Sequence, residues 1–168
     1  MNAMQVRALM HELMDENPFA IRAVLRILSV EFTNAVPTLA VTNGPRPRLL
    51  INLSFVTKHC KTEEHVKALL CHEFLHVLLR HTDEPGRPTP ARHLAADAVI
   101  NAIIHRQLGE KYSSMMARYY ANSPGLLKML RPMLPSERGA CLGQGRPGAA
   151  AAPSWWQAWF ALYEGKLL

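Results

Sequence analysis

The chain has 168 residues, 49% of them hydrophobic, and is therefore long enough to bury a sizeable core as one domain. Its net charge of +6 permits a nucleic-acid or acidic protein partner, but the cations are spread through the chain and support nucleic-acid binding only weakly. Three scattered cysteines without a CxxC pair argue against a disulfide framework and a thiolate zinc site, and free thiols indicate a reducing compartment, here the cytoplasm. No signal peptide is evident and no run approaches the roughly 18 apolar residues of a membrane span, so no membrane partner is expected.

The first third of the chain predicts two helices followed by a β-hairpin. Residues 3–16 carry apolar side chains at helical spacing, Asn17-Pro18 then breaks the chain, and a second apolar helical face follows. Residues 38–42 and 49–54 are β-type runs joined by a turn-rich connector that contains Asn-Gly. We therefore expect a small sheet immediately before the next helix.

Residues 62–81 read TEEHVKALLCHEFLHVLLRH and contain the pattern HExxH. In an α-helix His72 and His76 project from one face, where two imidazoles can bind one zinc ion. Glu73 lies about 100° further round the helix, so its carboxylate can reach a zinc-bound water without occupying a coordination position, as a general base must. Thr62, followed by two glutamates, predicts the start of this helix.

The same helix is apolar nearly all the way round, which is typical of a buried helix. Buried histidines and a buried glutamate each need a partner, because desolvating a polar group without compensation is costly. Zinc is one such partner, and the alternative is a pair of hydrogen-bonded core histidines beside a surface glutamate. We expect His65, two turns before His72, to lie on the surface rather than in the cleft. Zinc peptidases commonly keep a strand before this helix whose free edge pairs with extended substrate. Residues 49–54 have two interpretations, such an edge strand or part of a hairpin that only covers the core.

A further helix is expected from about residue 90 to 108, with a polar stripe formed by His93, Asp97, Asn101 and His105. Aspartate is a poor helix former and is costly to bury unpaired, so Asp97 is the predicted third zinc ligand, brought to the imidazoles by a helix that returns antiparallel. Asn101 is then expected to accept the ring N–H of a liganding histidine and to fix its tautomer.

Two other histidines are alternatives for the third ligand. His93 precedes Asp97 by one helical turn. If it is not a ligand, we expect it to contact and orient one of the liganding side chains. His81 falls five residues after His76, with no glycine to turn the chain, and faces well away from the histidine pair while the helix continues. For His81, His93 and His105 the alternatives are capping or support of a ligand.

The rest of the chain predicts helices at about 110–122 and 124–131, a flexible linker rich in Gly, Ala and Pro at 132–153, and a tryptophan-containing helix at 154–168. We expect residues 1–131 to form the domain and the last helix to dock on it.

The run CHEFLHVLLRH followed by HLAADAVINAII resembles the bacterial metallopeptidase domain that precedes a von Willebrand factor A-like module. The family's HExxH falls on His72, Glu73 and His76, and its Ala-Ala-Asp-x-x-x-Asn pattern ends on Asp97 and Asn101. The resemblance is specific over roughly residues 60–105 and implies a peptidase-like site. Thermolysin-type zinc peptidases are similar in their arrangement of an HExxH helix and a second helix that supplies a downstream acid.

These patterns together predict an α+β, mainly helical, zincin-like domain in which a small sheet flanks the HExxH helix. One Zn²⁺ held by His72, His76 and Asp97 would activate water, and Glu73 would take its proton and pass it to the leaving amine of a peptide or protein substrate. One alternative is a non-catalytic zinc-containing module that binds a protein or nucleic acid, which a fourth protein ligand would favour. The other is a zinc hydrolase that acts on a non-peptide amide.

Overall fold

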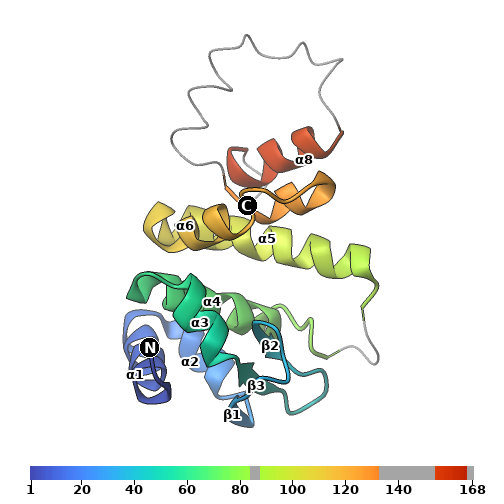
Figure 1. Cartoon of the computed structure of the whole chain (residues 1–168). Coiled ribbons are helices and arrows are strands. Elements are labelled where there is room, and N and C mark those ends of the chain that lie inside the picture. Colours follow the sequence, from blue (N-terminus) through green and yellow to red (C-terminus); the bar gives the residue numbers. More distant parts are fainter. Residues whose placement is uncertain (84–87, 133–153, 166–168) are drawn as a thin grey trace. The chain divides into compact units, whose positions relative to one another are not determined.

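The computed structural model describes residues 1–83, 88–132 and 154–165 (Figure 1). The described part is mainly helical with one small sheet, which confirms the α+β class. The chain divides into two compact units, Met1–His93 and Leu94–Leu168, and the boundary lies inside helix α5 (Pro90–Leu108). The expected domain of residues 1–131 stays a prediction. Of the predicted linker, residues 133–153 lie outside the described residues. Within the described part, no helix combines the length and the apolar character needed to cross a membrane.

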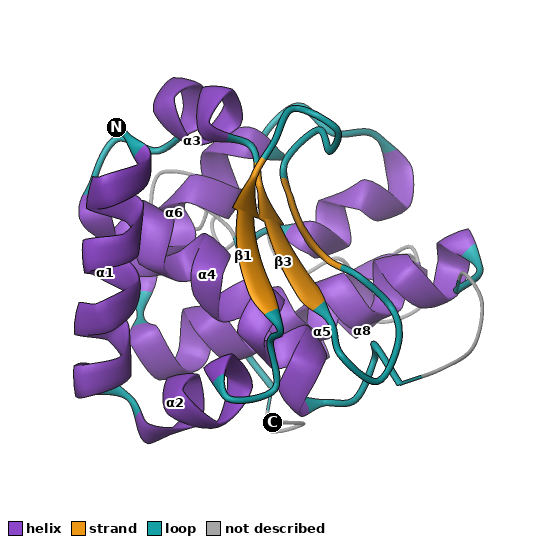
Figure 2. Ribbon diagram, turned by 90° about the horizontal axis from the view of Figure 1, so that it is seen from below, coloured by secondary structure: helices purple, strands orange, loops and turns teal. Residues whose placement is uncertain are grey.

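The first unit combines four helices with a three-stranded sheet (Figures 1 and 2). The strand order is β1-β3-β2, with β1 parallel and β2 antiparallel to β3. The elements are α1 (Ala3–Glu16), α2 (Pro18–Val24), β1 (Ser29–Phe32), β2 (Leu39–Val41), β3 (Arg48–Ile51), α3 (Leu53–His59) and α4 (Glu63–Leu78).

The predicted hairpin is confirmed as β2 and β3, in which Leu39 pairs with Ile51 and Val41 with Leu49. The assignment of a free edge to the second hairpin strand is wrong, because β3 is the central strand and has a neighbour on each side. Strand β1 and helix α3 were not predicted. The apolar run that continues past β3 suggested a longer strand, whereas the side chain of Asn52 accepts a hydrogen bond from the Phe55 N–H and starts a helix there.

Helix α4 is the central element of the first unit, in contact with α1, α2 and β2. Its apolar side chains Val66, Leu70 and Phe74 are fully buried, as expected for a helix that is hydrophobic all round. On the side of α1, the Lys67 ammonium is 2.7 Å from Glu16 and 3.2 Å from Glu12. Although burial alone lowers the pKa of Lys67, the hydrogen bonds to these carboxylates raise it overall. The HExxH residues are therefore carried by a packed, well-anchored helix.

The second unit contains α5, α6 (Glu110–Tyr119), the 3₁₀ helix η1 (Gly125–Leu130) and α8 (Ser154–Tyr163). Gly109 ends α5 with φ of 87°, a backbone conformation that favours glycine. Helix α8 contacts η1, and its Trp159 and Tyr163 pack against Ala102 of α5. The Trp159 indole N–H also donates to the Arg131 carbonyl at 2.8 Å. The last described helix is thus docked within this unit.

Candidate metal centre

The N-terminus of α4 is capped by two side chains. Thr62 accepts a hydrogen bond from the His65 N–H, as the sequence predicts for a helix start. His65 Nδ1 in turn accepts from the Lys61 N–H at 3.0 Å. The surface role expected for His65 is therefore wrong: its side chain is buried and accepts a hydrogen bond from the main chain just before the helix.

The two HExxH imidazoles face each other across one helical turn of α4. Their Nε2 atoms are 3.1 Å apart, and the ring planes meet at 61°. Two Zn–N bonds of about 2.1 Å at a tetrahedral angle would hold the two nitrogens about 3.4 Å apart. His72 is half-buried and His76 is buried. The spacing of the two nitrogens therefore fits a shared metal ion.

The C-terminus of α4 brings another histidine to this pair. The helix ends at Leu78, and Arg80 adopts φ of 62°, which turns the chain back. The Arg80 N–H donates to Val77 O and the His81 N–H to His76 O, at 3.2 Å and 2.9 Å, which is the Schellman arrangement. His81 Nδ1 then lies 3.0 Å from His76 Nδ1. The expectation that His81 faces away from the histidine pair is wrong, because it assumed that the helix continues. The chain turns without a glycine because Arg80 itself adopts the left-handed backbone conformation.

His93 also lies beside His76 but makes a different contact. The two rings are nearly parallel, at 17°, with centroids 6.1 Å apart. The His93 side chain is exposed. Its ring plane is therefore nearly parallel to that of His76, whereas a ring nitrogen of His81 meets a ring nitrogen of His76.

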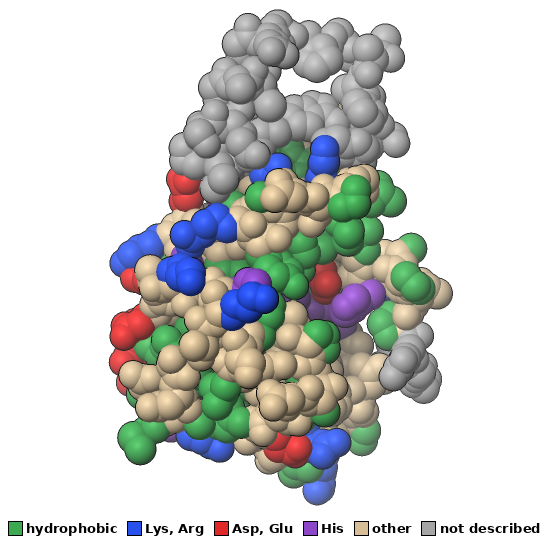
Figure 3. All heavy atoms as spheres, viewed as in Figure 1, with side chains coloured by type: hydrophobic (Ala, Val, Ile, Leu, Met, Phe, Trp, Pro, Cys, Tyr) green, Lys and Arg blue, Asp and Glu red, His purple; other side chains and the backbone are tan. Residues whose placement is uncertain are grey.

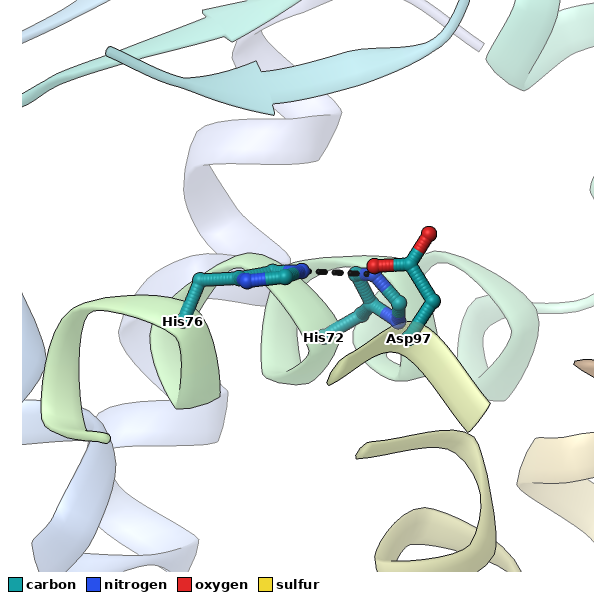
Figure 4. A group of neighbouring side chains, drawn as sticks. All are labelled: His72, His76 and Asp97. Atoms are coloured by element: carbon teal, nitrogen blue, oxygen red, sulfur yellow. Dashed lines mark hydrogen bonds between the residues drawn. The ribbon is translucent and has the colours of Figure 1, made fainter. Parts of the chain in front are cut away.

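Asp97 joins the histidine pair, as the sequence predicts. His72, His76 and Asp97 each offer one ligand atom, and these three atoms all lie within 4.8 Å of one another. Figure 4 shows the imidazoles from α4 and the carboxylate from α5 pointing toward one another, with the contact between the two rings dashed. Among the described residues, neither His81 nor His93 is a member of this group. The three side chains could hold a metal ion.

The donor set consists of two imidazole nitrogens and one carboxylate oxygen. Two imidazole nitrogens and one carboxylate oxygen are ordinary zinc ligands, and neither His81 nor His93 completes a four-ligand cage here. Cys71 precedes His72 in the chain, but burial raises the pKa of its thiol to about 12, with a smaller contribution from the charge of Glu16. Among the described residues, Cys71 is not a member of the group that could hold a metal ion.

Glu73 is buried, 8% exposed, on the same turn of α4 as His72. A buried carboxylate in a helix interior needs a partner, because leaving its charge without compensation is costly. The position of Glu73 next to His72 is the one that the general-base prediction requires. The role itself stays a prediction.

The other two residues of the predicted polar stripe have partners in the second unit. The buried Asn101 donates its amide N–H to Leu130 O at 2.9 Å, at the end of η1. His105 Nδ1 lies 2.8 Å from the hydroxyl of the fully buried Ser113 on α6. These contacts join helices of the second unit, and the expected bond from a liganding histidine to Asn101 stays a prediction.

Lys and Arg side chains form several separate groups on the face shown in Figure 3, and some of them lie beside acidic side chains.

Comparisons with known proteins add no relative: no family model, curated protein or solved structure matches the chain.

Proposed function

We propose that this protein is a zinc-dependent metallopeptidase with His72, His76 and Asp97 as metal ligands and Glu73 as general base. The observation that carries the proposal is the convergence of the two imidazoles and one carboxylate within 4.8 Å. The resemblance of both motif-bearing segments to the metallopeptidase domain that precedes von Willebrand factor A-like modules supports the same reading.

A zinc ion bound by this group would supply Lewis-acid activation of water and of a substrate carbonyl. The chain's own residues supply the rest. Three protein ligands leave one position of a tetrahedral site for solvent or substrate. The Glu73 carboxylate takes a proton from the attacking water and returns it to the leaving amine, a task worth about 10²–10⁴-fold in rate. The buried, apolar surroundings of α4 keep the site dry and strengthen its electrostatic interactions.

A strand edge for an extended peptide is available on β2 rather than on β3. In the antiparallel ladder Asn52 N–H bonds to Thr38 O and Thr42 N–H to Arg48 O, so the main-chain groups of Leu39 and Val41 face away from β3. Strand β2 also contacts α4. Pairing of a peptide along this edge is the proposed mode of substrate binding, and it favours peptide bonds over other amides.

The non-catalytic binding module is less well supported. It requires a fourth protein ligand, and the group within the described residues has three members. The basic side chains on the face in Figure 3 are dispersed, so nucleic acid is not the partner we propose.

The test is a comparison of wild type with Glu73→Gln for zinc content and for hydrolysis of an unstructured protein such as casein. We expect the variant to keep zinc within about 3-fold and to lose at least about 10²-fold in rate. Chelation should abolish wild-type hydrolysis and added zinc should restore it. A Glu73→Gln protein that keeps zinc and hydrolyses as fast as wild type would overturn the proposed mechanism.

A further inference from the structure

His76 is held between two other histidines through both of its ring nitrogens. Its Nε2 is 3.1 Å from His72 Nε2, and its Nδ1 is 3.0 Å from His81 Nδ1. The rings of His76 and His81 meet edge-on, at 67° with centroids 5.1 Å apart. A neutral imidazole carries its proton on one nitrogen only, so the contact at Nδ1 determines what Nε2 can do.

We propose that His81 is a positioning residue that accepts a hydrogen bond from the Nδ1–H of His76 and thereby keeps the Nε2 lone pair available to a metal ion. This inference rests on the proposed function, in which that Nε2 is a ligand. With the proton on Nδ1, Nε2 can coordinate; with the proton on Nε2, it cannot. His81 accepts through Nδ1 and carries its own proton on Nε2.

The main-chain turn at the end of α4 holds the His81 ring against the His76 ring. The His81 N–H donates to the carbonyl of His76 at 2.9 Å, so the two residues are joined by their main chains as well as by their rings. The turn depends on the left-handed conformation of Arg80, whose guanidinium forms an ion pair with Asp83 at 2.6 Å. A residue five places beyond a ligand is thus fixed against that ligand by the local backbone.

The second neighbour of His76 provides the contrast. His93 stacks on the face of the ring and is exposed. The contact described for His93 is between ring planes, whereas the His81 contact is between two ring nitrogens 3.0 Å apart. Loss of His81 is therefore expected to change the protonated nitrogen of His76, which a change in packing alone would not do.

The first experiment measures zinc affinity of the full-length chain by chelator competition. His81→Ala should weaken binding about 10-fold, within the range for residues that orient metal ligands. His81→Asn should stay within about 3-fold of wild type, because its Oδ1 can accept where Nδ1 did. Arg80→Gly removes the ion pair but tolerates positive φ and should leave affinity unchanged. His11→Ala, an exposed histidine on α1, is the matched control.

The second experiment reads the His76 tautomer directly, by ¹⁵N NMR of the zinc-free protein. We expect the proton on Nδ1 in wild type and on Nε2 in His81→Ala. A wild-type proton on Nε2, or an unchanged tautomer and affinity in His81→Ala, would overturn the inference while leaving the proposed function intact. Wild-type protein that binds no zinc would overturn the proposed function, and the tautomer would still decide the inference. Should His81→Ala fail to fold, the wild-type tautomer decides alone.

Discussion

The two halves of helix α5 carry the same polar pattern but have different partners. In the N-terminal half, His93 stacks on His76 and Asp97 belongs to the candidate metal group. In the C-terminal half, Asn101 binds Leu130 O and His105 binds Ser113. A polar residue every fourth position therefore identifies one face of a helix but not what that face meets. The first pair should serve metal binding and the second pair the stability of the second unit.

The largest expected effect is the loss of zinc binding on removal of the carboxylate in the N-terminal half. Four-ligand structural zinc sites bind with about 10–16 kcal/mol, or roughly 3–4 kcal/mol per ligand. Asp97→Ala should therefore weaken zinc binding on the order of 10²–10³-fold, with little change in the unfolding midpoint of the zinc-free protein. Isothermal titration of both proteins measures this. Unchanged affinity would remove Asp97 from the ligand set.

The next largest effect is expected in the C-terminal half of α5, where a substitution should lower the free energy of unfolding. Asn101→Leu keeps a similar volume but leaves the buried Leu130 carbonyl without the amide donor. We expect a loss of about 1–3 kcal/mol in the free energy of unfolding, measured by denaturant titration of the zinc-free protein. Zinc affinity should stay within about 3-fold of wild type. A variant of normal stability that binds zinc 10-fold more weakly would instead support the tautomer-fixing role predicted for Asn101.

A smaller effect is expected one turn further along α5. Ser113→Ala removes the hydroxyl that lies 2.8 Å from His105 Nδ1, in a fully buried position. The loss of this hydrogen bond should cost about 1 kcal/mol of unfolding free energy, without an effect on zinc. Ser114→Ala on the same helix, where the side chain is only half-buried, is the matched control. Equal stability of the two variants would contradict a structural role for the His105 contact.

The smallest effect is expected where α8 contacts η1 within the second unit. The Tyr163 hydroxyl donates to Met129 O at 3.1 Å, and burial raises the pKa of this phenol. Tyr163→Phe keeps the ring that stacks on Trp159 and removes only that bond, so we expect a loss of about 0.5 kcal/mol, at the low end for one hydrogen bond. The buried phenol is favoured in its neutral form, so its contribution is complete below the ordinary pKa of tyrosine and declines only in strongly alkaline solution. Wild type and variant should therefore differ equally at pH 6 and pH 8, as thermal unfolding can show.

The candidate site was predictable from two separate signals, the residue spacing within α4 and one unusual residue in α5. HExxH spacing sets two imidazoles on one face of α4, and a lone aspartate in an apolar helix needs a cation, which led to Asp97. The position of His81 was not predictable in the same way. It depends on a non-glycine residue, Arg80, adopting positive φ, an uncommon event that residue type alone does not signal.

Other features escaped for related reasons. The sequence predicts a surface position for His65 because the hydrogen bond of its side chain goes to the main-chain N–H of Lys61, which no side-chain pattern reveals. Strand β1 is four residues long and only partly buried, so it lacks the alternation of buried and exposed residues that identifies a strand. The choice of β2 as the edge strand depends on where β1 pairs, a long-range contact that local periodicity cannot specify.

The central claim is a metal bound by two imidazoles and one carboxylate with a position left for solvent, and X-ray absorption at the zinc edge of the loaded wild-type protein tests it most directly. We predict two imidazole nitrogens at about 2.0–2.1 Å, with oxygen donors completing the shell. A third or fourth imidazole, or a sulfur at about 2.3 Å, would contradict it.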